Sequence, residues 1–164
     1  MIKMCFFAMC FALLLGCRDS GGQVQVSVSQ DSALETGELP RKALINTGAR
    51  QIVSGWPAFL ELENSMDGLY RVENGEELRL LLDELQEKEK ALAEAQYPRL
   101  FDQPQVFSRQ KVFKTYLLKA KASLIYRTEP QEACVEMLQA YNALCEQFNV
   151  LVNSQLDTLL LSDE

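Results

Sequence analysis

Apolar residues recur at steps of three and four along the second half of the chain, which is the period of an amphipathic helix. The most regular run covers 129–161, and a second set of apolar positions (Met137, Leu144 and Leu151) widens its stripe. So wide an apolar surface packs against more than one neighbour, as helices do in a bundle. The stripe consists of Cys134, Leu138, Tyr141, Cys145, Phe148, Val152, Gln155 and Leu159.

Two further long helices are predicted over 75–96 and 103–127, because each segment repeats its apolar residues with the same period. The stripe of the first consists of Leu78, Leu82, Leu85, Leu92 and Ala95. The stripe of the second consists of Phe113, Tyr116, Leu117, Ala120 and Leu124.

A capping signal precedes each of these three runs. A residue with a short polar side chain stands three positions before a Glu or Gln, a spacing that satisfies two backbone N–H groups at a helix start. The signals therefore predict where each long helix begins. The pairs are Asn74 with Glu77, Asp102 with Gln105, and Thr128 with Gln131.

The first half of the chain predicts shorter elements. Pro57 suits a first helical turn and opens an amphipathic segment over 57–72, whereas 40–46 is expected to form one or two helical turns ended by Gly48. Residues 17–38 are rich in Gly, Ser, Gln and Asp and read as a flexible tether, in which Val24–Val28 is extended and unpaired. The sequence thus predicts an all-α fold, an up-down antiparallel helical bundle over 39–164, with three long helices and a shorter one.

The N-terminus carries a targeting signal. Lys3 precedes an uncharged apolar run, which ends in Leu14-Leu15-Gly16-Cys17. A run of about 12 residues has the length of a signal-peptide core and is well short of the ~20 residues that span a bilayer as a helix. With a small residue directly before the cysteine, this end resembles the lipobox signal peptide of bacterial lipoproteins.

The resemblance to lipoproteins implies a membrane anchor. Residues 1–16 would be removed, and Cys17 would become the first mature residue, carrying a diacylglyceryl thioether and an N-acyl chain such as palmitate. Several acyl chains bury enough CH₂ groups to hold a soluble domain on a membrane. Residue 18 is Arg rather than Asp, and the sorting habit of the family then implies the outer membrane, facing the periplasm.

Composition excludes several kinds of chemistry. The chain has no histidine, so Ser-His-Asp and Cys-His catalysis, Glu-x-x-His di-iron sites and H-E-x-x-H zinc sites are excluded. A calcium loop beginning at Glu63 is rejected, since its twelfth position is Asn74 rather than a bidentate Glu. Pairs of acidic residues are expected on outer helix faces or in caps. We therefore expect no enzyme, no metal site and no cofactor.

Two cysteines, Cys134 and Cys145, remain beyond the signal and the lipid site. Eleven residues apart on one predicted helix, they would be separated by about 16 Å, too far for a disulfide between them. They are expected to be buried free thiols, which pack as small hydrophobic groups. A bridge to another molecule is the alternative in an oxidising compartment.

Charge is distributed unevenly along the chain. The net charge is −7, which disfavours nucleic acid as a partner, yet 103–128 contains six bases and no acid. One interpretation is charge complementarity between neighbouring helices. The other is a basic face for an anionic headgroup or an acidic partner, for which Lys111, Lys114 and Lys121 are the candidate residues because they point away from the predicted core stripe.

Two functions remain. The first is a non-enzymatic adaptor that is anchored to the membrane and binds another envelope protein through helix-in-groove surfaces. In size and layout the chain is similar to pilotin-type lipoproteins, a resemblance that implies escort of secretion-channel subunits to the outer membrane. The second is a carrier for a small apolar or anionic ligand inside the bundle, with Tyr116, Tyr141 and Gln155 as its polar contacts.

Overall fold

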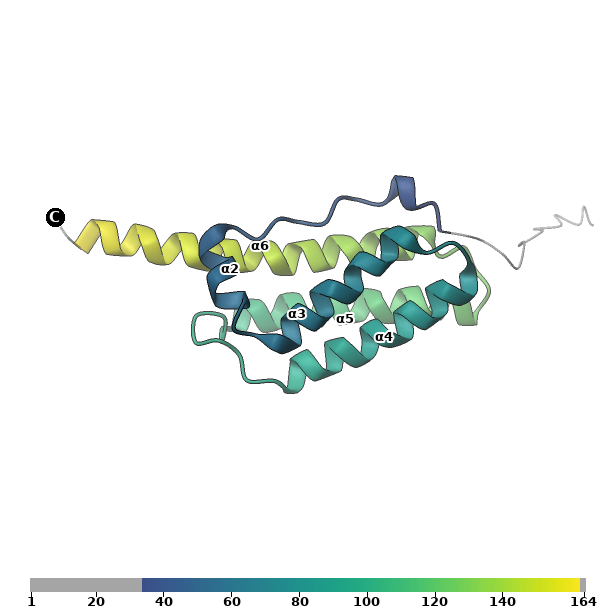
Figure 1. The fold of residues 1–164 in the computed structure, drawn as a ribbon, viewed down its shortest axis with the longest axis horizontal. Helices are drawn as coiled ribbons and strands as arrows, with labels where there is room; N and C mark the ends of the chain where they lie inside the picture. The colour runs from purple at the N-terminus through teal and green to yellow at the C-terminus, as the bar shows by residue number, and fades with distance from the viewer. Residues whose placement is uncertain (1–33, 163–164) are drawn as a thin grey trace, which may run out of the picture.

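The computed structural model describes residues 34–162, with side chains described as far as Gln155, and every long element in that range is a helix (Figure 1). The prediction of an all-α fold is confirmed. The predicted signal peptide, Cys17 and Val24–Val28 lie outside the described residues. The helices are α2 (Thr47–Val53), α3 (Pro57–Met66), α4 (Gly75–Glu94), α5 (Pro104–Ile125) and α6 (Gln131–Ser162), with 3-10 turns η2 (Thr36–Glu38) and η3 (Asp67–Arg71).

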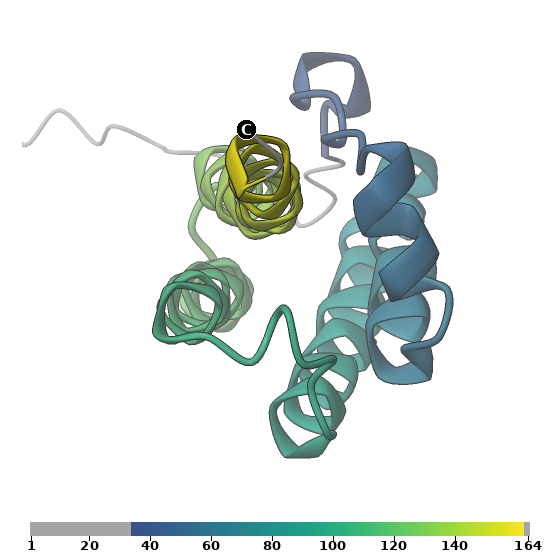
Figure 2. The ribbon, with the colours of Figure 1, turned by 90° about the vertical axis from the view of Figure 1, so that its left-hand side faces the viewer.

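The helices form a bundle of two layers. Figure 2 shows α5 and α6 together on one side and α3 with α4 on the other. The most extensive contact is between α5 and α6, while α4 packs against both α3 and α5, and α2 rests on α6. No helix in the described part of the chain is long and apolar enough to cross a membrane.

Most of the predicted core positions are buried. Leu78, Leu82, Leu85 and Leu92 of α4 and the α6 stripe from Cys134 to Val152 all face the interior. Gln155, which the period placed on that stripe, is exposed. Figure 1 shows the reason, because the C-terminal part of α6 continues beyond the ends of the other described helices.

One of the three predicted capping signals is confirmed. The Glu77 N–H donates to Asn74 Oδ1 at 2.9 Å, and Asn74 is the N-cap of α4. The other two are wrong. Helix α5 starts at Pro104 after Gln103, with no side-chain cap, and the Thr128 hydroxyl donates back to the Ser123 carbonyl.

Residues 40–46 are not helical, so that prediction is wrong. The chain is extended there, and α2 begins only at Thr47, where Asn46 Oδ1 accepts from the Ala49 N–H at 2.8 Å. Gly48 lies inside α2, and a Cβ there would come within 2.7 Å of Val152 Cγ1, so α2 approaches α6 closely at this point.

Residues 34–46 form what we call the strap, which runs over the bundle beside α6 (Figure 1). Leu34, Leu39 and Ile45 bury their side chains against the helices, at 4%, 8% and 9% exposure. Residues 34–38, which the sequence assigned to the tether, therefore belong to the folded domain.

Candidate functional site

Two of the three candidate lysines make ion pairs inside the protein. Lys114 Nζ lies 3.2 Å from Glu89 Oε2, and Lys121 Nζ lies 2.6 Å from Asp83 Oδ1, so both connect α5 to α4. On the other side of α5, Lys119 pairs with Glu136 of α6. These contacts agree with the interpretation that the basic helix is placed between two acidic neighbours by charge complementarity.

Lys111 differs from the other two lysines. Its side chain is exposed, and no ion pair to it is found among the described residues. Leu118 and Ile125 follow at intervals of seven residues, which places all three on one side of α5. Leu118 is 44% exposed and Ile125 is 73% exposed. We call this surface the α5 outer face, defined by Lys111, Leu118 and Ile125.

Two acidic residues are buried, contrary to the expectation that acids lie on outer faces or in caps. Glu89 is 2% exposed and Glu63 is 8% exposed. The sequence contained a signal for Glu89, because it stands four residues after Leu85 and three before Leu92, where the α4 stripe continues.

A chain of polar groups fixes the Glu89 carboxylate. The Gln110 amide donates from Nε2 to Glu89 Oε1 at 3.2 Å, and the Tyr97 hydroxyl donates to Gln110 Oε1. Burial raises the pKa of the Tyr97 phenol to about 12, so the phenol remains a proton donor at physiological pH. Glu89 Oε2 is also buried and is paired with Lys114 Nζ at 3.2 Å, and among the described residues no further polar group bonds to it.

This carboxylate borders a hollow between the two helices, which we call the α4–α5 cavity. It has a volume of about 440 Å³ and is open to solvent. The rings of Tyr97 and Phe107 meet edge to face at its wall, with centroids 5.0 Å apart. Lys111 and Lys114 also line the cavity, so two predicted partner-binding residues share it with an acid that sequence reasoning missed.

The residues expected to contact a ligand do not gather at this cavity. Tyr141 is fully buried, and its ring stacks on Phe59 with centroids 6.3 Å apart. Tyr116 is half-buried on α5, and Gln155 is exposed. None of the three lines the α4–α5 cavity.

A second polar arrangement holds the strap on α6. Asn142 Oδ1 accepts from the Ala43 N–H at 2.8 Å, while its amide donates to the Arg41 carbonyl at 2.8 Å. Asn149 makes the same pair of bonds. Its Oδ1 accepts from the Asn46 N–H at 2.8 Å, and its amide donates to the Leu44 carbonyl at 3.0 Å. Gln131 bonds both backbone groups of Glu35. We call Gln131, Asn142 and Asn149 the amide clamp.

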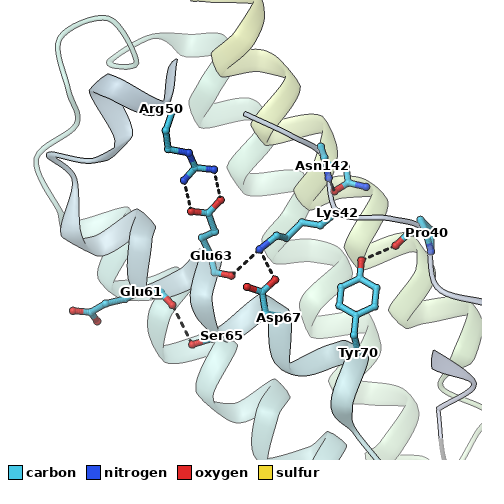
Figure 3. A network of polar contacts seen from close by, with 10 residues as sticks. Pro40, Lys42, Arg50, Glu61, Glu63, Ser65, Asp67, Tyr70 and Asn142 are labelled. Atoms are coloured by element: carbon cyan, nitrogen blue, oxygen red, sulfur yellow. Dashed lines mark hydrogen bonds and ion pairs between the residues drawn. The ribbon is translucent and has the colours of Figure 1, made fainter. Parts of the chain in front are cut away.

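Helix α3 and turn η3 hold the strap from its other side (Figure 3). Lys42 pairs with Asp67, and the Tyr70 hydroxyl donates to the Pro40 carbonyl at 2.6 Å. Nearby, the guanidinium of Arg50 in α2 donates two hydrogen bonds, of 2.6 and 2.9 Å, to the Glu63 carboxylate. These bonds raise the pKa of the guanidinium. The strap is therefore fastened to both layers of the bundle.

The two described cysteines are free and buried on one unbroken helix, as the sequence predicted. Burial raises the pKa of both the Cys134 and the Cys145 thiol to about 12. At pH 8 only about one such thiol in ten thousand is ionised, against about one in four for an exposed thiol of pKa ~8.5.

We therefore expect iodoacetamide to alkylate Cys134 and Cys145 at least ~100-fold more slowly at pH 8 in the native protein than in denaturant. Peptide mapping by mass spectrometry resolves the two sites. The thiols of the unfolded chain ionise at a lower pH than the buried thiols of the folded protein. The stability that the two neutral thiols contribute is therefore fully present below pH ~8.5 and decreases as the pH rises above that value. Equal alkylation rates in the native and denatured protein would show that the thiols are accessible.

Within the described residues, no group of three or more His, Cys, Asp or Glu side chains is placed to hold a metal ion. Compared with known proteins, the chain matches no protein-family model, no curated protein and no solved structure.

Proposed function

We propose that this protein is a lipid-anchored adaptor of the bacterial cell envelope, which acts by binding another envelope protein rather than by catalysis. Cys17 would carry the lipid, and the bundle would face the periplasm from the outer membrane. The lipobox-like sequence Leu14-Leu15-Gly16-Cys17 supports the anchor. The expected partner is an amphipathic helix with acidic residues.

The proposed arrangement of the bundle is up-down and antiparallel. Helix α4 packs against α3, α5 against α4, and α6 against α5, so each helix contacts the next one in the chain. Only short connections separate them, and short connections favour antiparallel neighbours. In this arrangement one side of α5 is exposed to solvent, and Lys111 and Ile125 on that side also border hollows against α4.

The observation that carries the proposal is the α5 outer face. Leu118 and Ile125 are exposed apolar residues on one side of the helix, and Lys111 adds a positive charge that has no ion-pair partner among the described residues. Apolar contact gives a partner helix affinity, and the cation selects an acidic one.

The test is capture of the partner from detergent-solubilised membranes with the intact lipoprotein. The variant combines Lys111→Glu with Leu118→Asp, which leaves the internal pairs of Lys114 and Lys121 intact. We expect one envelope protein to be recovered stoichiometrically by the parent and at least ~10-fold less by the variant, because both the apolar contact and the charge attraction are lost.

A matched control carries Lys90→Glu with Leu80→Asp on α4. Lys90 is exposed and Leu80 is 55% exposed, so the control makes the same charge changes on a different helix. It should recover the partner as well as the parent does. A Cys17→Ala form tests the anchor, and its loss from the membrane fraction is expected. Equal recovery by the variant and the control would refute docking on the α5 outer face.

A further inference from the structure

The strap covers a surface formed by α6 on one side and by α3 with η3 on the other (Figure 3). We call this surface the strap seat, defined by the amide clamp of α6 and by Asp67 and Tyr70 of η3. We propose that the strap seat is a binding site for an extended segment of a partner protein, and that the strap is an internal occupant which this segment displaces. The inference goes beyond the adaptor proposal, because it concerns another surface and an extended partner rather than a helical one.

The two asparagines of the amide clamp bind the backbone of the strap. Each bonds the carbonyl of one strap residue and the N–H of the residue two positions later, as Asn142 does with Arg41 and Ala43. Asn149 makes the same two bonds three residues further along the strap. Every residue except proline offers both groups. The clamp therefore recognises an extended chain with little regard to its sequence.

The spacing of the clamp also matches an extended chain. Asn142 and Asn149 are seven residues apart, which corresponds to about 10.5 Å along a helix. The strap groups that they bond are three residues apart, which corresponds to about 10 Å in an extended chain. Because the two lengths agree, both asparagines meet the backbone of an extended segment in the same way. Main-chain bonds of this kind supply affinity in peptide recognition, while seats for side chains supply specificity.

The side chains of the strap define the pattern that a partner segment needs. Leu34, Leu39 and Ile45 are buried against the helices, and Lys42 pairs with Asp67. Counted from the first of these residues, the pattern has apolar side chains at positions 1, 6 and 12 and a cation at position 9. We expect a partner segment to carry these four groups.

The attachment of the strap permits exchange. Within the described residues the strap is joined covalently to the bundle only where α2 begins, at Thr47. The backbone groups that Asn142 and Asn149 bond belong to no helix or strand, so their release leaves the helices intact. Arg41 is exposed and Leu44 is 87% exposed, so a partner segment can differ from the strap at these positions.

The first measurement is fluorescence anisotropy with a labelled peptide that has the sequence of residues 34–46, added to the full-length protein in detergent. The receiving variant, Leu39→Ser with Ile45→Ser, weakens the internal strap and leaves the strap seat unchanged. We expect one-to-one binding at least ~10-fold tighter than to the parent, whose own strap competes at an effective concentration of about 1 mM. Hydrogen exchange of α4 and α6 checks the fold. Absence of saturable binding to the folded receiving variant would overturn the proposal.

Further changes in the receiving variant assign the clamp. Adding Asn142→Leu and Asn149→Leu should weaken peptide binding at least ~10-fold, because four hydrogen bonds are lost. The matched control adds Gln139→Leu and Gln155→Leu, two exposed amides of α6, and should bind like the receiving variant. Equal weakening in both would contradict recognition by the clamp.

Methylated peptides test recognition of the backbone. Methylation of the Ala43 nitrogen removes the donor to Asn142 and should weaken binding at least ~10-fold. Methylation of the Leu44 nitrogen is the control, because no hydrogen bond from this N–H is found among the described residues, and it should change affinity less than ~3-fold. If the two methylated peptides bind equally, the clamp does not bind the backbone of the peptide.

Displacement is measured in the parent. A peptide with Arg41→Gln and with dimethyl-lysine at position 42 keeps the charge and resists trypsin. At saturation it should make cleavage of the parent's own strap at least ~5-fold faster, whereas the peptide methylated at the Ala43 nitrogen and protected in the same way should not. Binding without faster cleavage would overturn displacement of the strap.

The same variants separate this inference from the adaptor proposal. Leu118→Asp on α5 should lose the helical partner and leave peptide binding to the receiving variant unchanged. Asn142→Leu with Asn149→Leu should keep the helical partner and lose the peptide. Either proposal can therefore fail without the other.

Discussion

Replacing Phe148 with alanine is expected to lower the free energy of unfolding by about 3–5 kcal/mol, the usual cost of deleting a fully buried aromatic side chain. Phe148 of α6 is 0% exposed. Its ring centroid lies 4.4 Å from that of Phe101, 5.1 Å from that of Phe59 and 6.0 Å from that of Trp56. The substitution therefore removes the centre of an aromatic cluster that joins α6 to α3 and to the loop before α5.

Chemical denaturation measures this loss. Val150→Ala is the control, because Val150 lies on the same helix and is 52% exposed, and its cost should be below about 0.5 kcal/mol. An unchanged slope against denaturant would show that the difference lies in stability and not in the extent of unfolding. A cost below about 1 kcal/mol for Phe148→Ala would mean that this cluster is not the core of the bundle.

The second large effect is expected in the amide clamp. The double change Asn142→Leu with Asn149→Leu removes four hydrogen bonds to the strap backbone. At about 0.5–1.5 kcal/mol for each bond, the strap should lose about 2–6 kcal/mol of its attachment. Leucine has a similar volume and neither donates nor accepts, so the backbone of 41–46 loses these partners on α6, while Gln131 still holds Glu35.

Limited trypsin digestion detects release of the strap, because Arg41 and Lys42 lie within it. Cleavage there should be at least ~10-fold faster in the double variant, while the amide protons of α4 and α6 keep their protection against hydrogen exchange. The control replaces Gln139 and Gln155, two exposed amides of α6, and should digest like the parent. Unchanged cleavage would show that the remaining contacts, made by Gln131, Lys42 and Tyr70, hold the strap without Asn142 and Asn149.

Local pattern was sufficient for the long helices. In α6, the period of three and four residues placed Leu138, Cys145 and Phe148 on the buried side correctly. The reason is geometric, since a residue's direction around a helix depends only on its position in the chain. The same rule placed Gln155 in the core, and it was wrong there because the rule contains no information about where the neighbouring helices end.

Local pattern was not sufficient for 40–46. The residues that hold this segment extended, Asn142 and Asn149, follow their partners Ala43 and Asn46 by 99 and 103 residues. A preference for helical turns within the segment is outweighed by hydrogen bonds that exist only once α6 lies beside it. The capping signals at Asp102 and Thr128 failed for a similar reason, because the path of each loop decides which residue starts the helix.

The sequence by itself determined that this protein is all-helical, that its α6 cysteines are buried apart from each other, and that α5 is a basic helix between acidic ones. Each of these follows from the order of residues along one helix. Only the tertiary structure decided which charges are satisfied, because the packing of α5 against α4 brings Lys114 to Glu89 and Lys121 to Asp83. The same packing buries Glu89 beside a cavity and leaves Lys111 at its edge, since a contact between two helices depends on how they dock and not on the spacing within either one.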